Sequence, residues 1–188
     1  ITLYAVSPTL LMLFFISQAK IKNPIVVYKT CKSLKFITGL VCVFISTACI
    51  YCLMFFTSYF GQSATGMSTS FFFTGVMLLP PACMLIIMSL ITPKLILRFG
   101  VKNIMLLGHL LILSGMLSLM WLPSDVSYLN LWWRYIIIGT GCGVVFSASA
   151  PLCTQEVAPK DAGVAAGIQW TVGFIGASII LTLCSVWY

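Results

Sequence analysis

Six long apolar runs dominate the sequence, and their length is the feature that most limits the possible folds. The runs cover residues 1–19, 36–59, 71–92, 104–122, 131–154 and 164–187. A helix rises about 1.5 Å per residue, so about 20 apolar residues cross a hydrocarbon core that is about 30 Å thick. Each run is therefore long enough to span a membrane.

We expect these runs to be helices rather than strands. Lipid offers no hydrogen-bond partner to backbone groups, so a spanning segment must satisfy its own N–H and C=O groups. Composition agrees, because 61% of the 188 residues are hydrophobic and 7% are charged, unlike a soluble domain. The sequence predicts an all-α, multi-pass protein of the cell membrane (the inner membrane in a Gram-negative bacterium) with about six transmembrane helices.

The basic residues predict how the chain is oriented. Nine of the ten Lys and Arg residues lie in the connections 20–35, 93–103 and 155–163, which share one side if the spans alternate. The connections 60–70 and 123–130 contain none, and Arg134 is the single base near them. Short cytoplasmic loops carry this excess of positive charge. The net charge of +7 thus reports topology, and we expect lipids rather than nucleic acid as partners.

Cysteine and acidic residues give no sign of a metal site or of catalysis. Most of the eight cysteines lie inside the apolar runs, and the C-x-x-C pair Cys49 and Cys52 has no second pair and no nearby His. We interpret them as small apolar side chains, with no metal, cofactor or disulfide expected. His, Asp and Glu do not cluster at a membrane face, so an enzyme is not expected.

Glycines at four-residue spacing predict close helix packing. Gly139 and Gly143 share one helix face, and Gly163 and Gly167 repeat the pattern in the last run. Small residues at this spacing let a neighbouring backbone approach. The run "GTGCG" that begins at Gly139 has no strand before it, which favours packing over nucleotide binding.

Two adjacent prolines interrupt the third run. Pro80 and Pro81 each lack the N–H that a helix interior needs, and their rings clash with the preceding turn. We therefore predict a break in this span.

Several segments, taken in order, carry a family resemblance. They read "QAKIKNPIVVYKTCKSLKF", "TGVMLLPP", "ITPKLILRFGVKNIMLLG", "IIIGTGCGVVFSASAP" and "VAPKDAGVAAGIQWTVGFIGASI". Together they resemble the C-terminal half of the major facilitator superfamily, most closely its fourteen-span drug/proton antiporter branch. The resemblance implies that residues 36–188 form most of a C-terminal transporter bundle whose last span is missing. It also implies that 1–19 is a truncated span and that an N-terminal bundle of the same polypeptide precedes it.

The family carries a gating loop of the form G-x-L-x-D-R-x-G-x-[RK] after the second helix of each half. Arg98, Gly100 and Lys102 match it, whereas Pro93 replaces the first Gly and Leu97 replaces the Asp. The resemblance implies a gating role for the three matching residues. The alternative is that Arg98 and Lys102 only anchor the topology.

By the same resemblance, the runs 36–59, 71–92, 131–154 and 164–187 line a substrate cavity. Candidate substrate contacts are Gln169, Trp170 and Thr171 in the last run and Tyr51, Met54 and Phe55 in the run 36–59. The three acids, Asp125, Glu156 and Asp161, all fall in connections, so a proton-exchanging carboxylate belongs to the missing half or the protein is not proton-driven. His109 is a second candidate for coupling, with helix packing as its alternative.

The resemblance implies a fragment of a secondary active transporter that exports amphipathic or cationic small molecules by alternating access, with protons as the candidate coupling ion. A transport-inactive, degenerate or truncated transporter that serves as a membrane scaffold is the alternative. The missing Asp of the gating loop favours that alternative slightly.

Overall fold

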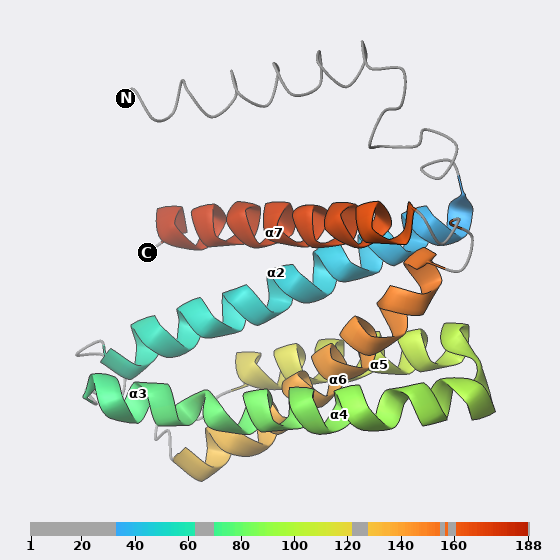
Figure 1. Cartoon of the computed structure of the whole chain (residues 1–188). Helices are drawn as coiled ribbons and strands as arrows, with labels where there is room; N and C mark the ends of the chain where they lie inside the picture. Colours follow the sequence, from blue (N-terminus) through green and yellow to red (C-terminus); the bar gives the residue numbers. More distant parts are fainter. Residues whose placement is uncertain (1–32, 63–69, 122–127, 155–156, 158–160, 188) are drawn as a thin grey trace, which may run out of the picture.

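The computed structural model describes residues 33–62, 70–121, 128–154, 157 and 161–187. These residues form the helices α2 (Leu34–Gln62), α3 (Phe71–Met77), α4 (Leu79–Phe99), α5 (Val101–Met120), α6 (Tyr128–Thr154) and α7 (Ala162–Trp187) (Figure 1). The predicted span 1–19 and most of the basic connection 20–35 lie outside the described residues.

Five helical segments of the described chain are long and apolar enough to cross a membrane, with α3 and α4 counted as one segment. The predicted class, an all-α multi-pass membrane protein, is confirmed. The helices extend beyond the predicted runs because the backbone keeps its internal hydrogen bonds as far as the interface with water. α2, for example, ends at Gln62 rather than at residue 59.

Helix α6 is the central element of the described bundle. It lies against α4 and α5 on one side and against α2 on the other, while α2 also packs along α7 (Figure 1). The fully buried side chains include Tyr135, Ile138 and Val145 of α6. α6 is consequently the most buried of the described membrane-spanning helices.

Glycines of α6 bring its backbone against two neighbours. A Cβ atom at Gly139 would lie 2.5 Å from the Cα and carbonyl oxygen of Pro81, and one at Gly143 would lie 2.9 Å from the Cα of Leu85. Gly141 faces α5 instead, where a Cβ would lie 2.7 Å from the carbonyl oxygen of Gly108. Gly139 and Gly143 therefore face the backbone of α4, and Gly141 faces that of α5.

Gly163 and Gly167 make no such contact within the described chain. A Cβ at either position would have no atom of the described chain within 4 Å. α7 instead packs on α2 through Gly173, beside Thr47, and Gly176, beside the carbonyl oxygen of Phe44. The close contact of α7 with α2 is thus made by a second pair of glycines, which are offset from Gly163 and Gly167 by about 80–180° around the helix.

The break in the third run occurs at Leu78, which separates α3 from α4. Pro80 and Pro81 follow directly in the first turn of α4, where a missing N–H costs no hydrogen bond within the new helix. The prolines therefore start a helix, and the discontinuity falls just before them.

The predicted connection 93–103 is wrong in extent. α4 continues through Pro93 to Phe99, α5 begins at Val101, and Gly100 alone separates the two helices. The residues from 94 to 99 contain no glycine or further proline, and Gly100 is the first helix-breaking residue after Pro93. Gly100 has φ 79° and ψ 151°, a backbone conformation that is essentially restricted to glycine.

The described basic residues gather at one end of the bundle. Lys35 begins α2, Arg98 ends α4 and Lys102 begins α5, and these three helix ends lie on the same side in Figure 1. Arg134 lies near the start of α6, at the opposite end. This distribution matches the charge bias from which the cytoplasmic side was predicted.

We predict that Gly139→Ala destabilises the bundle, because a methyl group there overlaps the backbone of Pro81 and must push α4 away. The expected cost is about 1–3 kcal/mol, as for other overpacked cores. Thermal unfolding of the purified full-length protein in detergent measures it. Gly75→Ala is the matched control, since its Cβ would meet no described atom within 4 Å. Equal midpoints for the two variants would contradict the proposed packing.

Candidate transport surface on α2, α6 and α7

An aromatic cluster joins three helices. The rings of Phe146 in α6 and Trp170 in α7 are stacked, with centroids 5.9 Å apart and an interplanar angle of 16°. Trp170 also contacts Phe174 at 6.1 Å, and Phe174 meets Tyr51 of α2 edge to face at 6.4 Å. The four residues Tyr51, Phe146, Trp170 and Phe174 are called the aromatic cluster below. Such pairs add about 0.5–1.5 kcal/mol beyond the burial of their area.

The cluster is open on one side. Trp170 and Phe174 are each 51% exposed, whereas Tyr51 and Phe146 are half-buried beneath them. The rings of Trp170 and Phe174 are therefore accessible from outside the described bundle. Their inner sides contact Phe146 of α6 and Tyr51 of α2. Such a surface attracts flat apolar molecules, and aromatic faces also attract cations.

The structure brings together some of the predicted substrate contacts. Tyr51 and Trp170 belong to one cluster and are linked through Phe174. Met54 is exposed one turn further along α2, and the ring of Phe55 stacks on Tyr59 of the same helix at 6.3 Å. Met54 and Phe55 thus extend the aromatic face of α2 away from Trp170.

Gln169 lies behind this surface. It is 5% exposed, and its Nε2 donates a hydrogen bond of 2.9 Å to the hydroxyl oxygen of Ser149 in α6. Ser149 in turn donates to the carbonyl oxygen of Phe146 at 2.9 Å. The amide of Gln169 therefore ties α7 to α6 in this conformation, and its contact with substrate stays a prediction.

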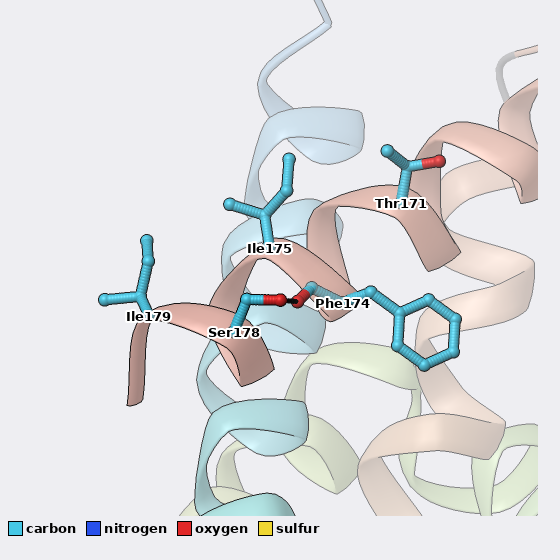
Figure 2. A pocket seen from close by; sticks show the side chains of 5 residues that line it. All are labelled: Thr171, Phe174, Ile175, Ser178 and Ile179. Atoms are coloured by element: carbon cyan, nitrogen blue, oxygen red, sulfur yellow. Dashed lines mark hydrogen bonds between the residues drawn. The ribbon is translucent and has the colours of Figure 1, made fainter. Parts of the chain in front are cut away.

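Thr171 lines a shallow groove along the outer face of α7. The groove has a volume of about 390 Å³, and its lining residues are Thr171, Phe174, Ile175, Ser178 and Ile179 (Figure 2). The hydroxyl of Thr171 donates to the carbonyl oxygen of Gly167, and that of Ser178 donates to Phe174. Because each hydroxyl has used its proton on its own helix, both oxygens face the groove as acceptors.

The predicted gating loop is centred on Gly100, with Arg98 before it and Lys102 after it. Arg98 lies in the last turn of α4 and Lys102 in the first turn of α5, so they belong to different helices. Both are exposed, and the Arg98 guanidinium lies 5.4 Å from the ring centroid of Phe99. Leu97, which replaces the family's Asp, is 89% exposed.

Ionisable groups are sparse among the described residues. Asp161, just before α7, is the single described acid. The Nδ1 atom of His109 is 2.9 Å from the carbonyl oxygen of Met105, one turn earlier in α5. No group of three or more His, Cys, Asp or Glu residues that could hold a metal is found in the described chain.

Arg134 is the one described cation inside the bundle. It is 7% exposed, donates to the carbonyl oxygen of Trp121 at 3.3 Å, and lies 4.9 Å from the ring centroid of Trp133. The hydrogen bond to Trp121 joins the beginning of α6 to the end of α5. This junction lies at the end of the bundle opposite to Lys35, Arg98 and Lys102 (Figure 1). Trp121, Trp132 and Trp133 are exposed around it, as in an interfacial aromatic belt.

Phe146 and Phe174, which complete the aromatic cluster, are not among the residues selected from the sequence. Phe174 lies one turn after Trp170, a spacing that places both on one helix face. Such a pair was a usable signal in α7. Phe146 had no comparable signal, because its partner lies on another helix.

Comparison with known proteins gives one family match and several curated relatives. The model of the Major Facilitator Superfamily matches residues 3–181. The multidrug transporter protein MdtP of Bacillus subtilis is 26% identical over 96% of this chain and 33% of its own length. The quinolone resistance protein NorB of Staphylococcus aureus is 23% identical over 100% of this chain and 40% of its own length.

A third relative is the tetracenomycin C resistance and export protein of Streptomyces glaucescens, which is 27% identical over 67% of this chain and 23% of its own length. The chain therefore spans between about a quarter and two fifths of the length of these curated relatives. No solved structure matches it.

We predict that Gln169 and Ser149 are energetically coupled. Changing Gln169 to Leu or Ser149 to Ala breaks one buried hydrogen bond between α6 and α7, and in the double variant the two losses should not add. A double-mutant cycle on thermal unfolding of the full-length protein should give a coupling of about 0.6–1.7 kcal/mol, as for other interhelical bonds in membranes. Thr171→Val, which changes an exposed hydroxyl, is the control. Strict additivity would contradict the assigned bond.

Proposed function

The chain belongs to the major facilitator superfamily, and from this membership we propose that it is part of a secondary active transporter that exports amphipathic or cationic small molecules. The names of the three relatives, which refer to multidrug transport, quinolone resistance and tetracenomycin C export, support this proposal. The described helices would form most of the C-terminal bundle, and the N-terminal bundle would belong to the rest of the polypeptide.

The aromatic cluster is the observation that carries the proposal. Trp170 and Phe174 offer half-exposed rings, held in place by Phe146 from α6 and Tyr51 from α2. A cation over such a ring gains about 0.5–2 kcal/mol, with more at desolvated sites. Rigid rings also accept many shapes of apolar body, so the cluster suits a broad set of amphipathic cations better than one polar metabolite.

Hydroxyl oxygens beside the rings add polar recognition. Thr171 and Ser178 lie on the same face of α7 as the Phe174 ring, and both oxygens can accept a hydrogen bond (Figure 2). An ammonium group that carries an N–H could bind one of these acceptors while its apolar part lies on the rings. The groove is built on α7 alone, and we propose that the other bundle supplies its opposite wall.

We propose that transport proceeds by alternating access, in which two bundles rock about a site near the middle of the membrane. Proton coupling needs an ionisable group at depth. Among the described residues the only acid, Asp161, lies just before α7. A coupling carboxylate is accordingly proposed for the part of the polypeptide beyond this chain.

We predict that Trp170→Ala raises the KM for export of a cationic dye by about 2- to 30-fold, the equivalent of about 0.5–2 kcal/mol of lost cation–π attraction. Trp170→Phe keeps an aromatic face and should lose less. The measurement uses full-length protein reconstituted in vesicles with an imposed proton gradient, with export expressed per correctly inserted molecule. A neutral analogue of the dye should respond less to Trp170→Ala than the cation does.

Trp132→Ala is the matched control, because it also removes an exposed tryptophan but lies at the start of α6. If both alanine variants export the dye like the wild type, the cluster is not a substrate surface. Absence of export by the wild type under any gradient would instead support the transport-inactive scaffold.

We further propose that Arg98 and Lys102 stabilise one conformational state from either side of Gly100. Both are exposed at the end of the bundle that is predicted to be cytoplasmic, where they can reach lipid phosphates or the C-terminal carbonyl groups of neighbouring helices. Gly100 holds α4 and α5 in a tight reversal, so the two cations keep a fixed spacing.

We predict that the double variant Arg98→Gln, Lys102→Gln slows export about 5-fold or more, because conformational coupling energies are typically about 1–3 kcal/mol. Insertion should be preserved by the remaining basic residues of the same side. The control is Lys35→Gln with Lys94→Gln, which removes the same charge from the ends of α2 and α4. Wild-type turnover in the first double variant would leave these residues as topology anchors only.

A further inference from the structure

Two cysteines from different helices meet inside the bundle. The sulfur atoms of Cys52 in α2 and Cys184 in α7 are 3.9 Å apart, and the contact is partly buried. Among the seven cysteines that the structure describes, no other pair has a sulfur–sulfur contact of this kind. Sequence alone gave no sign of it, because 132 positions separate the two residues.

The backbones on either side of this pair are held in place. α2 and α7 run side by side in the same direction (Figure 1). Gly173 and Gly176 bring α7 against Thr47 and the Phe44 carbonyl oxygen of α2. Helices in such close contact keep the two thiols near one another, so little chain entropy opposes a bond between them.

We propose that Cys52 and Cys184 are a thiol–disulfide site that ties α2 covalently to α7 when the membrane contains hydroperoxides. The bond requires a sulfur–sulfur distance of about 2.05 Å. Rotation about the two Cα–Cβ bonds, with a small shift of the helices, brings the sulfurs from contact to bonding distance. The proposal does not depend on what the protein transports.

The chemistry balances with a hydroperoxide as the oxidant. The sulfur of the first thiol attacks the peroxide, the O–O bond breaks, and the thiol proton leaves with the alkoxide as an alcohol, giving a sulfenic acid. The sulfur of the second thiol then attacks the sulfenic sulfur. The S–S bond forms, the S–O bond breaks, and the hydroxyl group leaves as water with the second thiol's proton. The two thiols lose two electrons, which the peroxide accepts.

Other described cysteines have different surroundings. Cys142 is buried in α6, and Cys83 is exposed on α4. Cys83 is therefore open to direct oxidation, and no sulfur of another described cysteine is in contact with it, which makes it a suitable control. Cys49, one turn before Cys52 on α2, tests whether any thiol of that helix can replace Cys52.

The test uses the full-length protein in membrane vesicles treated with cumene hydroperoxide. The vesicles are then denatured, remaining thiols are alkylated, and the protein is digested for mass spectrometry. We expect a peptide that joins Cys52 to Cys184 and is two hydrogen atoms lighter than its parts. Mass tagging of free thiols should show two fewer tags than before oxidation, and dithiothreitol should restore both.

Variants and a second reagent make the outcome decisive. In Cys52→Ser and Cys184→Ser the reducible loss of two tags should disappear, whereas Cys83→Ser should retain it. Phenylarsine oxide, which bridges two thiols without an oxidant, should protect both residues from alkylation in the wild type. A linked peptide from another pair, such as Cys49 with Cys184, would overturn the proposal. Protection by the arsenical with no disulfide after peroxide would also overturn it, because the thiols would then be close but unreactive.

Discussion

The close approach of α6 to α4 and α5 is the constraint on which the rest of the described bundle depends. Residues two apart on a helix point about 200° from one another, whereas residues four apart are offset by about 40°. Gly139 and Gly143 therefore meet α4, while Gly141 between them meets Gly108 of α5. The run "GTGCG" therefore gives α6 two faces without side chains, one towards α4 and one towards α5. This allows α6 to pack closely between the two helices.

This packing leaves the remaining face of α6 for polar contacts with α2 and α7. The hydroxyls of Tyr135 and Thr57 are hydrogen-bonded at 2.7 Å, which joins α6 to α2. The bond from Gln169 to Ser149 joins α6 to α7. Without water to compete, each bond favours one arrangement of the helices over others. These two hydrogen bonds fix the positions of α2 and α7 relative to α6. The exposed rings of the aromatic cluster, which belong to the same helices, are thereby held in place.

The class, the spans and part of the packing could be predicted from the sequence because lipid imposes simple rules on length, charge and backbone pairing. The direction in which side chains face could not. α7 is mostly apolar and carries only scattered hydroxyl and amide side chains, so its sequence does not distinguish the pair Gly163 and Gly167 from Gly173 and Gly176. Likewise, a single Gln in an apolar run gives the same signal for a substrate contact as for a buried interhelical bond. Only the position of Ser149 on α6 separates the two meanings.

The junction of α4 and α5 shows how a family motif can combine separate requirements. Gly100 is explained by its backbone alone, since its φ of 79° and ψ of 151° exclude side chains whether or not the segment takes part in gating. Arg98 and Lys102 are different, because both are exposed and no backbone requirement selects a cation there. At position 97 the family's carboxylate is replaced by a leucine that is 89% exposed, so Arg98 lacks the neighbour that would neutralise it locally. In the proposed gating role its charge acts on phosphates or helix ends outside the loop, so the effect of Arg98 would depend on what surrounds the bundle.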